Sequence, residues 1–226
     1  MLFLLPVICT AQQRISVGIQ VGNNYNSAYG KDIYNPCTKI GYGVYTLVKY
    51  DLDKHHSIMV EPGINQLGFQ IQFVDKADLF WTYHRKYSYS FNAFSIPVAY
   101  SYNFGRRQMF HLFAGGYIQY IYNSKVHWQD EGVMFKTTQY ADNGLSDINS
   151  FALGWNAGLL TGIGTSFTLI GKGRLRSPVT GFANTRYFTG IHNAFSYQEH
   201  TEDELHLYRE AHLTSFQVRV GISIPL

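Results

Sequence analysis

The sequence predicts an all-β fold, an eight-stranded antiparallel up-and-down transmembrane β-barrel, from three observations. The final stretch alternates strictly between apolar residues and polar or small ones: Phe216, Val218, Val220, Ile222, Ile224 and Leu226 against Ser215, Gln217, Arg219, Gly221 and Ser223. The 226 residues include 18 Tyr, 16 Phe and 21 Gly, and only 15% are charged. No run approaches the roughly 20 apolar residues of a membrane helix. A membrane span must therefore be a strand, with lipid on one side and a lumen on the other.

The first residues are typical of an export signal. Residues 1–11 (MLFLLPVICTA) are apolar and end in small side chains, so we expect a signal peptide there and the barrel domain at 12–226. No basic residue precedes the apolar run, so we expect either a translation start further upstream or a trimmed sequence. Lipidation of Cys9 is an alternative that the bulky Ile8 disfavours. Cys37 is then the only cysteine of the mature chain, so no internal disulfide can form.

The first four strands are expected at residues 14–23, 39–51, 57–73 and 87–104. The first one places its apolar residues on one parity: Ile15, Val17, Ile19 and Val21. A polar loop through Cys37 follows it, residues 51–56 make a short hairpin turn, and residues 74–86 form a long loop. Pro62 and Pro97 lack the N–H that a ladder needs, so we predict β-bulges at both.

The other four strands are expected at residues 109–128, 150–170 and 174–188, and from His212 to the end. The third of these alternates least regularly. Residues 105–108 and 171–173 form short turns, whereas residues 129–149 and 190–212 form long polar connections. Three short turns and four long loops place both termini with the short turns. In an outer-membrane barrel those turns face the periplasm. The long strands predict a wall that projects beyond the bilayer on the loop side.

Several segments carry a family resemblance. They are Glu61-Pro62-Gly63, FSIPV at 94–98, GLLTGIG at 158–164 and the apolar last strand. Together they resemble the small outer-membrane β-barrel proteins labelled porin-family or PorT-like, of the OmpA and OmpX type. The resemblance covers essentially the whole mature chain and implies a Gram-negative outer-membrane location. Leu226 departs from the terminal aromatic residue that is more usual there.

Polar residues of the inward parity form the first candidate site. Lys49, Glu61 and Arg219 are expected to form a lumen cluster beside Gln20, and inward glycines leave room for long side chains. The lumen of eight strands is filled by its own side chains, which excludes free diffusion of solutes. The cluster is interpreted as a structural network that satisfies buried charges. A narrow gated channel is the alternative.

Aromatic residues of the long loops form the second candidate site: Phe80, Trp81, Tyr83, Trp128, Phe135, Phe195 and Tyr197. Such side chains anchor a barrel at the membrane interface or serve as contact points for a partner.

Other chemistry receives little support from the sequence. His192, His200, His206 and His212 lie near four acidic residues, but their spacing fits no zinc motif. The segment fits an exposed helix, with Thr201 and Glu204 as a capping box. We predict no catalytic residues, no metal and no cofactor. The net charge of +3 is not clustered and gives no case for nucleic-acid binding.

The sequence therefore predicts an outer-membrane barrel with a structural or interaction role, as part of a secretion or uptake assembly. Its expected partners are outer-membrane lipid and another envelope protein, and the sequence does not indicate an oligomeric state. A lipid hydrolase or acyltransferase at the outer rim is the first alternative, which requires His84 or His127 beside a serine such as Ser150. A secreted soluble barrel around an apolar ligand is a further one.

Overall fold

A computed structural model describes residues 14–30, 36–76, 81–106, 109–134, 137–147, 154–170, 178–191 and 212–226. The signal segment expected at residues 1–11 lies outside this part. The strands are β1 (Ile15–Tyr29), β2 (Pro36–Cys37), β3 (Lys39–Asp51), β4 (His56–Val60), β5 (Gly63–Lys76), β6 (Trp81–Phe104), β7 (Phe110–Met134), β8 (Thr137–Asp147), β9 (Trp155–Ile170), β10 (Val179–Gly190) and β11 (His212–Pro225). Within the described residues, no helix is both long and apolar enough to cross a membrane.

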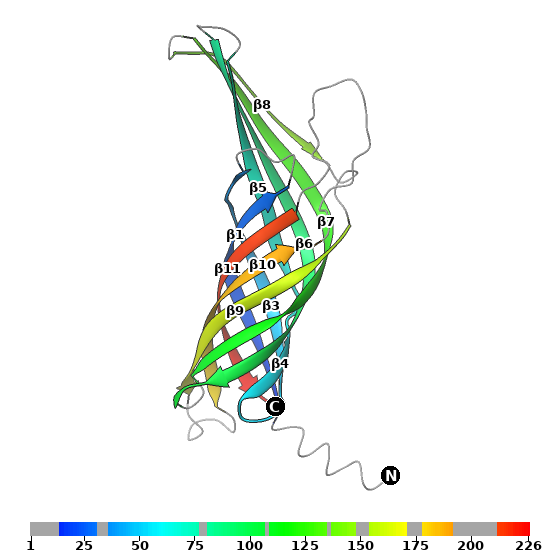
Figure 1. Cartoon of the computed structure of the whole chain (residues 1–226), viewed down its shortest axis with the longest axis vertical. Coiled ribbons are helices and arrows are strands. Elements are labelled where there is room, and N and C mark those ends of the chain that lie inside the picture. The colour runs from blue at the N-terminus through cyan, green and yellow to red at the C-terminus, as the bar shows by residue number, and fades with distance from the viewer. Residues whose placement is uncertain are drawn as a thin grey trace.

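The strands close into an antiparallel ring (Figure 1). β1 pairs with β11 on one side and with β3 on the other, and β6 pairs with β7. Since β4 and β5 together occupy one position, the ring has eight strands in the order β1, β3, β4/β5, β6, β7, β9, β10, β11. β2 and β8 are added at the edges of β5 and β7. The predicted fold class is confirmed.

The two faces of the wall have the predicted chemistry. On the last strand Phe216, Val218 and Val220 are exposed, whereas Gln217 and Arg219 are buried in the lumen. The exposed aliphatic band includes Ile19, Val21, Val44, Val48, Leu112, Ile163 and Ile222. Exposed aromatics flank it: Tyr25, Tyr42, Tyr120, Trp155 and Tyr187 toward one end, and Tyr50, Tyr100, Tyr102, Phe110 and Phe167 toward the other. An apolar band between two aromatic girdles is the outer surface of a transmembrane barrel.

The two ends of the barrel differ. At the end that we call the terminal end, β1 begins and β11 ends, and β3 connects to β4 through a short turn. Gly105 follows β6 with a φ of 81°, the left-handed conformation that glycine adopts without strain. At the other end, β6, β7 and β8 rise well above the remaining strands (Figure 1). The predicted projection of the wall is confirmed.

Two predicted loops are wrong, because they are strands in this projection. β5 continues to Lys76 and β6 starts at Trp81, so most of the expected loop at 74–86 is paired. Likewise, β7 continues to Met134 and β8 folds back along it, which replaces most of the expected loop at 129–149. We call residues 72–76, 81–86, 129–134 and 137–143 the arms. Their sequence lacks a regular alternation of apolar and polar residues, but their backbone groups pair as in any strand.

The predicted bulges at Pro62 and Pro97 are also wrong. Val60 pairs with Val98 and Gly63 with Ser95, so two residues separate these pairs on each strand and the register does not shift. Instead, the ladder simply loses the bonds that the prolines cannot donate. The strand breaks between β4 and β5 at Glu61 and Pro62. Across the break the Glu61 N–H still donates to the Pro97 carbonyl at 3.0 Å.

Candidate functional site: a buried charge network in the lumen

The Glu61 side chain points into the lumen because the break between β4 and β5 leaves the inward and outward alternation of the wall unchanged. Its carboxylate accepts hydrogen bonds from three side chains on other strands. Gln20 Nε2 donates to Oε1 at 2.8 Å, and Arg186 donates to both carboxylate oxygens, with its Nη2 at 2.6 Å from Oε1. Arg219 Nη1 reaches Oε2 at 3.3 Å. One carboxylate, between β4 and β5, is thus hydrogen-bonded to side chains of three other strands, β1, β10 and β11.

Both arginines are held by further contacts on their own strands. Arg186 Nε donates to Asn184 Oδ1 at 2.8 Å, and Arg219 Nε donates to Gln217 Oε1 at 2.9 Å. In each case the partner is two residues earlier in the same strand and therefore on the same face. These bonds orient the guanidinium groups toward Glu61.

The network is buried and carries a net positive charge. Glu61 and Arg186 are 1% exposed and Arg219 is 0% exposed. Removing charges from water costs several kcal/mol per ion, so the carboxylate must keep its partners. Two guanidinium groups and one carboxylate leave one positive charge that no acid in this network neutralises.

Aromatic rings support the two arginines. The Arg219 guanidinium carbon lies 3.4 Å from the center of the Tyr45 ring, and that of Arg186 lies 4.7 Å from the center of the Phe113 ring. At this range a cation is attracted to the ring face. The Tyr45 ring in turn lies against glycines: a Cβ on Gly63 would come within 2.4 Å of it, and one on Gly43 within 2.7 Å. The predicted role of inward glycines, room for large side chains, is confirmed here.

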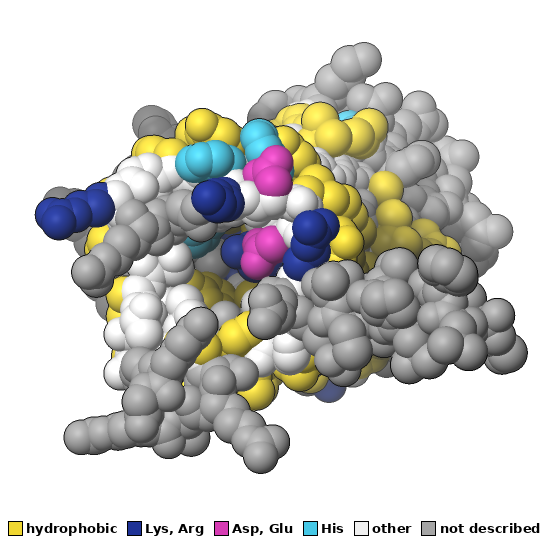
Figure 2. Space-filling model, turned by 90° about the horizontal axis from the view of Figure 1, so that it is seen from below, with side chains coloured by type: hydrophobic (Ala, Val, Ile, Leu, Met, Phe, Trp, Pro, Cys, Tyr) yellow, Lys and Arg dark blue, Asp and Glu magenta, His cyan; other side chains and the backbone are white. Residues whose placement is uncertain are grey.

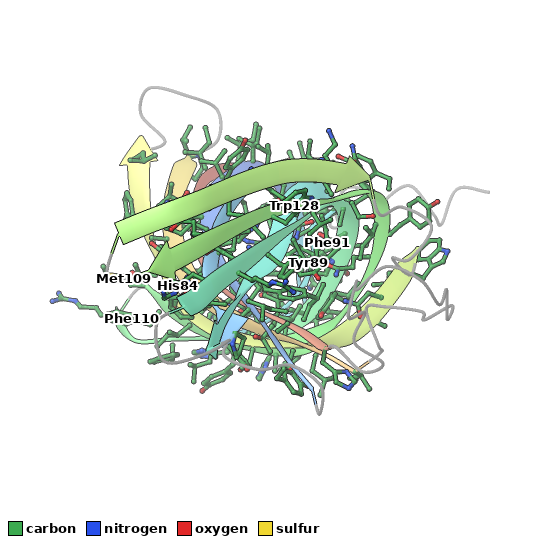
Figure 3. All side chains as sticks on the ribbon, turned by 90° about the horizontal axis from the view of Figure 1, so that it is seen from above. His84, Tyr89, Phe91, Met109, Phe110 and Trp128 are labelled. Atoms are coloured by element: carbon green, nitrogen blue, oxygen red, sulfur yellow. The ribbon has the colours of Figure 1, made fainter. Side chains whose placement is uncertain are left out.

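Apolar side chains fill much of the remaining lumen, which differs from the hydrophilic interior that the alternation suggests. Around the network one buried cluster contains Leu47, Met59, Ala99, Phe113, Tyr117, Leu160, Phe182 and Phe188. Toward the arms a second contains Ala28, Leu67, Phe69, Ile71, Tyr89, Phe91, Ala93, Ile121, Val126 and Leu213. Figure 3 looks down this end and shows Tyr89 and Phe91 inside the ring of strands. We call the second cluster the plug.

The structure brings together two of the three residues of the predicted lumen cluster. Glu61 and Arg219 meet, whereas the Lys49 amine lies 2.9 Å from Asp51 Oδ1 on its own strand, nearer the terminal end. Arg186 makes the closest contacts to Glu61 and was missed by the sequence analysis. A signal for it existed: Phe182, Asn184, Arg186 and Phe188 share one parity, but the mixture of apolar and polar residues on that parity hides the alternation.

The loop aromatics are distributed differently from the prediction. Trp81 and Tyr83 belong to β6, and Phe80, Phe135, Phe195 and Tyr197 lie outside the described residues. Trp128 lies on β7 and packs on its neighbour β8, where a Cβ on Gly144 would come within 2.4 Å of the indole.

His127, one of the two histidines of the enzyme alternative, lies beside a serine on the neighbouring strand, but that serine is hydrogen-bonded to a lysine. His84 lies opposite Glu131, and His127 lies opposite Ser88, on neighbouring strands. The Ser88 hydroxyl accepts a hydrogen bond from Lys39 Nζ at 2.9 Å. Ser150 lies outside the described residues, as do all of the acidic residues and all but His212 of the loop considered for metal binding. In the part that the structure describes, no three His, Cys, Asp or Glu side chains form a group able to hold a metal ion.

A closed eight-stranded ring, an apolar outer band with aromatic girdles and a filled lumen define a small transmembrane β-barrel. The sequence comparison agrees, since residues 10–196 match the family model described as outer membrane protein beta-barrel domain. The chain belongs to this family, and is therefore a protein of the bacterial outer membrane. No curated protein sequence matches it.

Three solved structures of similar outline are distant from this chain. Ail, the attachment invasion locus protein of Yersinia pestis, is 9% identical over 93% of this chain and 99% of its own, with a TM-score of 0.36. Neisserial surface protein A is 11% identical over 93% and 97%, with a TM-score of 0.38. OprG from Pseudomonas aeruginosa is 9% identical over 94% and 96%, with a TM-score of 0.37. Likeness at this level does not assign an activity.

Neutralising Glu61 should destabilise the barrel. In Glu61→Gln the two buried arginines face each other without a carboxylate, and the expected loss of unfolding free energy is about 3–5 kcal/mol. Urea-induced unfolding in lipid vesicles, followed by tryptophan fluorescence, measures it. Glu131→Gln, an exposed position on β7, is the matched control. A Glu61→Gln barrel as stable as this control would contradict the network. Adding Arg186→Met should recover part of the loss, because it removes one unpaired charge.

A methyl group on Gly63 should disturb the support of Arg219. The new Cβ would lie 2.4 Å from both the Tyr45 ring and the Val44 carbonyl oxygen, so the ring or the wall must shift. We expect Gly63→Ala to cost about 1–3 kcal/mol in the same unfolding assay. Gly116→Ala is the control, since the nearest atom to its Cβ is 3.4 Å away. Equal stability of the two variants would mean that the Tyr45 ring adapts freely.

Proposed function

We propose that this protein is an outer-membrane interaction module with a blocked lumen, which presents its arms outside the cell and keeps both termini in the periplasm. One observation carries the proposal: the lumen is obstructed by the charge network and the plug, while paired strands extend well beyond the barrel. A barrel with a projecting sheet and a filled interior is suited to contacting other molecules. It is poorly suited to passing solutes.

The filled lumen supports the non-porin part of the proposal. Tyr45, Phe69, Phe91 and Arg219 are among the largest fully buried side chains, and they come from different parts of the wall. Barrels of this strand number have interiors just wide enough for their side chains, whereas open aqueous channels occur at about 16 to 18 strands. The narrow gated channel remains the second candidate, since the network residues are polar. The plug disfavours it.

The geometry of the arms supports the interaction role. Gln72 pairs with Lys86, Lys86 with Gln129, and Gln129 with Asn143, so four strands lie side by side across the base of the arms. The two strands at the edges of this sheet, β5 and β8, offer backbone groups for pairing with an extended partner. We propose another envelope protein as that partner, within a secretion or uptake assembly.

The protein should form no lasting pore in planar lipid bilayers. Side chains of the network and the plug obstruct the lumen at two levels, so we expect no sustained ohmic current at low voltage after reconstitution. Shifted gel mobility of the unheated protein confirms folding in the same preparation. A steady open state of the folded barrel would contradict the blocked lumen and favour the channel.

Trimming the arms should remove contacts without unfolding the barrel. Replacing residues 73–85 and 130–142 each by Asn-Gly joins direct cross-strand partners through two-residue turns that keep the register. His127→Cys, in a Cys37→Ser background, lies just below the trimmed level at an exposed position. A membrane-impermeant maleimide carrying a photoreactive group then attaches to this site on intact cells.

We expect the reagent to label His127→Cys from outside, and to leave Lys54→Cys, in a turn at the terminal end, unlabelled. Illumination should yield a crosslinked envelope protein with full-length arms and lose it with trimmed arms. Labelling of Lys54→Cys instead would reverse the proposed orientation. The same crosslinks with and without arms would show that the arms are not the contact surface.

A further inference from the structure

The terminal end of the barrel contains a cavity that neither the network nor the arms explain. Its volume is about 470 Å³, and its walls come from all eight positions of the ring, near the strand ends at this side. Ser16, Asp51 and Pro225 lie toward its mouth, and Glu61 and Arg186 lie at its inner end. Figure 2 views this end and shows basic, acidic and histidine side chains gathered around a hollow. The size is that of a small-molecule site.

The lining of this cavity contains hydrogen-bond donors that the fold does not use. Ser101 is 1% exposed, and its hydroxyl has no hydrogen-bond partner within the described residues. Arg186 has five N–H donors, of which three make the contacts to Glu61 and Asn184. Asn103 Nδ2 makes a single long contact of 3.4 Å, to Ser57 Oγ. A buried donor without a partner costs free energy unless a ligand fills the role.

A glycine makes room for one further lining group. The His111 ring stacks on Phe113 with a centroid distance of 5.8 Å and extends over β9, where a Cβ on Gly164 would come within 2.2 Å of Nε2. Any other residue at 164 would push the imidazole from this position. The absence of a side chain at Gly164 thus lets the His111 imidazole lie against the β9 backbone at the cavity wall.

The charges that line this cavity balance, but one further positive charge lies behind them. Lys49 and Asp51 form an ion pair at 2.9 Å and cancel each other. Among the lining residues Glu61 is paired with Arg186, whereas Arg219, the second arginine that contacts Glu61, lies behind the cavity wall and adds one positive charge that no acid of the network neutralises. Because the cavity is the solvent-accessible space beside this buried charge, low-dielectric walls focus its field there. An anion that enters gains this attraction together with the unused donors.

We propose that the cavity at the terminal end binds a small oxyanion, a phosphate or a carboxylate, through Arg186, Ser101 and Asn103. Planar N–H donors and a hydroxyl are the groups that recognise such oxygens. Asp51 and Glu61 do not prevent this, since each is already paired with a cation. The site lies at the end opposite to the arms and is independent of their proposed role.

Inorganic phosphate is the first probe. The full chain, folded in uncharged detergent micelles, is dialysed to equilibrium against radiolabelled phosphate at constant ionic strength. We expect saturable binding of one phosphate per chain. Acetate as a competitor distinguishes the two sources: displacement indicates a site for carboxylates as well, and no displacement restricts the site to phosphate.

Two variants and one control test the site without changing the residues of the charge network. Lys49→Gln leaves Asp51 unpaired at the cavity and removes the excess positive charge, so affinity should fall about tenfold. Lys54→Gln makes the same change of charge on the exposed turn outside the cavity and should leave affinity within about twofold. Ser101→Ala removes one donor at unchanged charge and should weaken binding about tenfold.

The double variant Lys49→Gln/Asp51→Asn restores the charge balance and should recover most of the affinity lost in Lys49→Gln. Absence of saturable phosphate binding to the folded wild-type barrel would overturn the proposal. Equal effects of Lys49→Gln and Lys54→Gln, with no effect of Ser101→Ala, would overturn it too, because binding would then follow only the total charge.

Discussion

The structure depends on a closed ladder of backbone hydrogen bonds. In hydrocarbon no water is present to pair with a free N–H or C=O, so a sheet can cross a membrane only when its edges meet. Here the ring closes with eight strands, and this number fixes a narrow lumen. Every second side chain must share that space. Tyr45 fits because Gly43 and Gly63 carry no side chain beneath it, and Glu61 fits because it is paired.

The weakest row of the ladder coincides with the charge network. Pro62 and Pro97 remove two N–H donors in neighbouring strands, and Glu61 lies between them in the wall, with its own N–H bonded to Pro97. The Glu61 side chain then connects to β1, β10 and β11 across the lumen. Side-chain bonds therefore reinforce the wall at the row where backbone bonds are missing. A buried charge network adds little stability compared with an apolar core. Its reinforcement of the wall explains why it lies at the level of the two prolines.

The sequence predicted the fold because the alternation of apolar and polar residues reflects the different surroundings of the two faces of a strand. Val218 and Gln217 face different surroundings, and the pattern of β11 reveals it. The same rule failed for the arms, because their sequence does not alternate regularly and their pairing as strands could not be read from it. It also failed for Arg186, because the lumen next to it accepts Phe182 and Phe188. Which side chains meet across the lumen depends on how the barrel closes. The spacing of residues along the chain therefore could not show that Glu61 pairs with Arg186 rather than with Lys49.

The network and the plug divide the protein into two ends that work separately. A change in the arms reaches the terminal cavity only through the plug and then through the Glu61 cluster, both of which are packed and buried. Packed interiors resist small displacements rather than passing them on gradually. We therefore expect little coupling between the arms and the terminal end. A ligand in the terminal cavity, by contrast, contacts Arg186 directly, so its binding free energy adds to the stability of the network that holds the wall together.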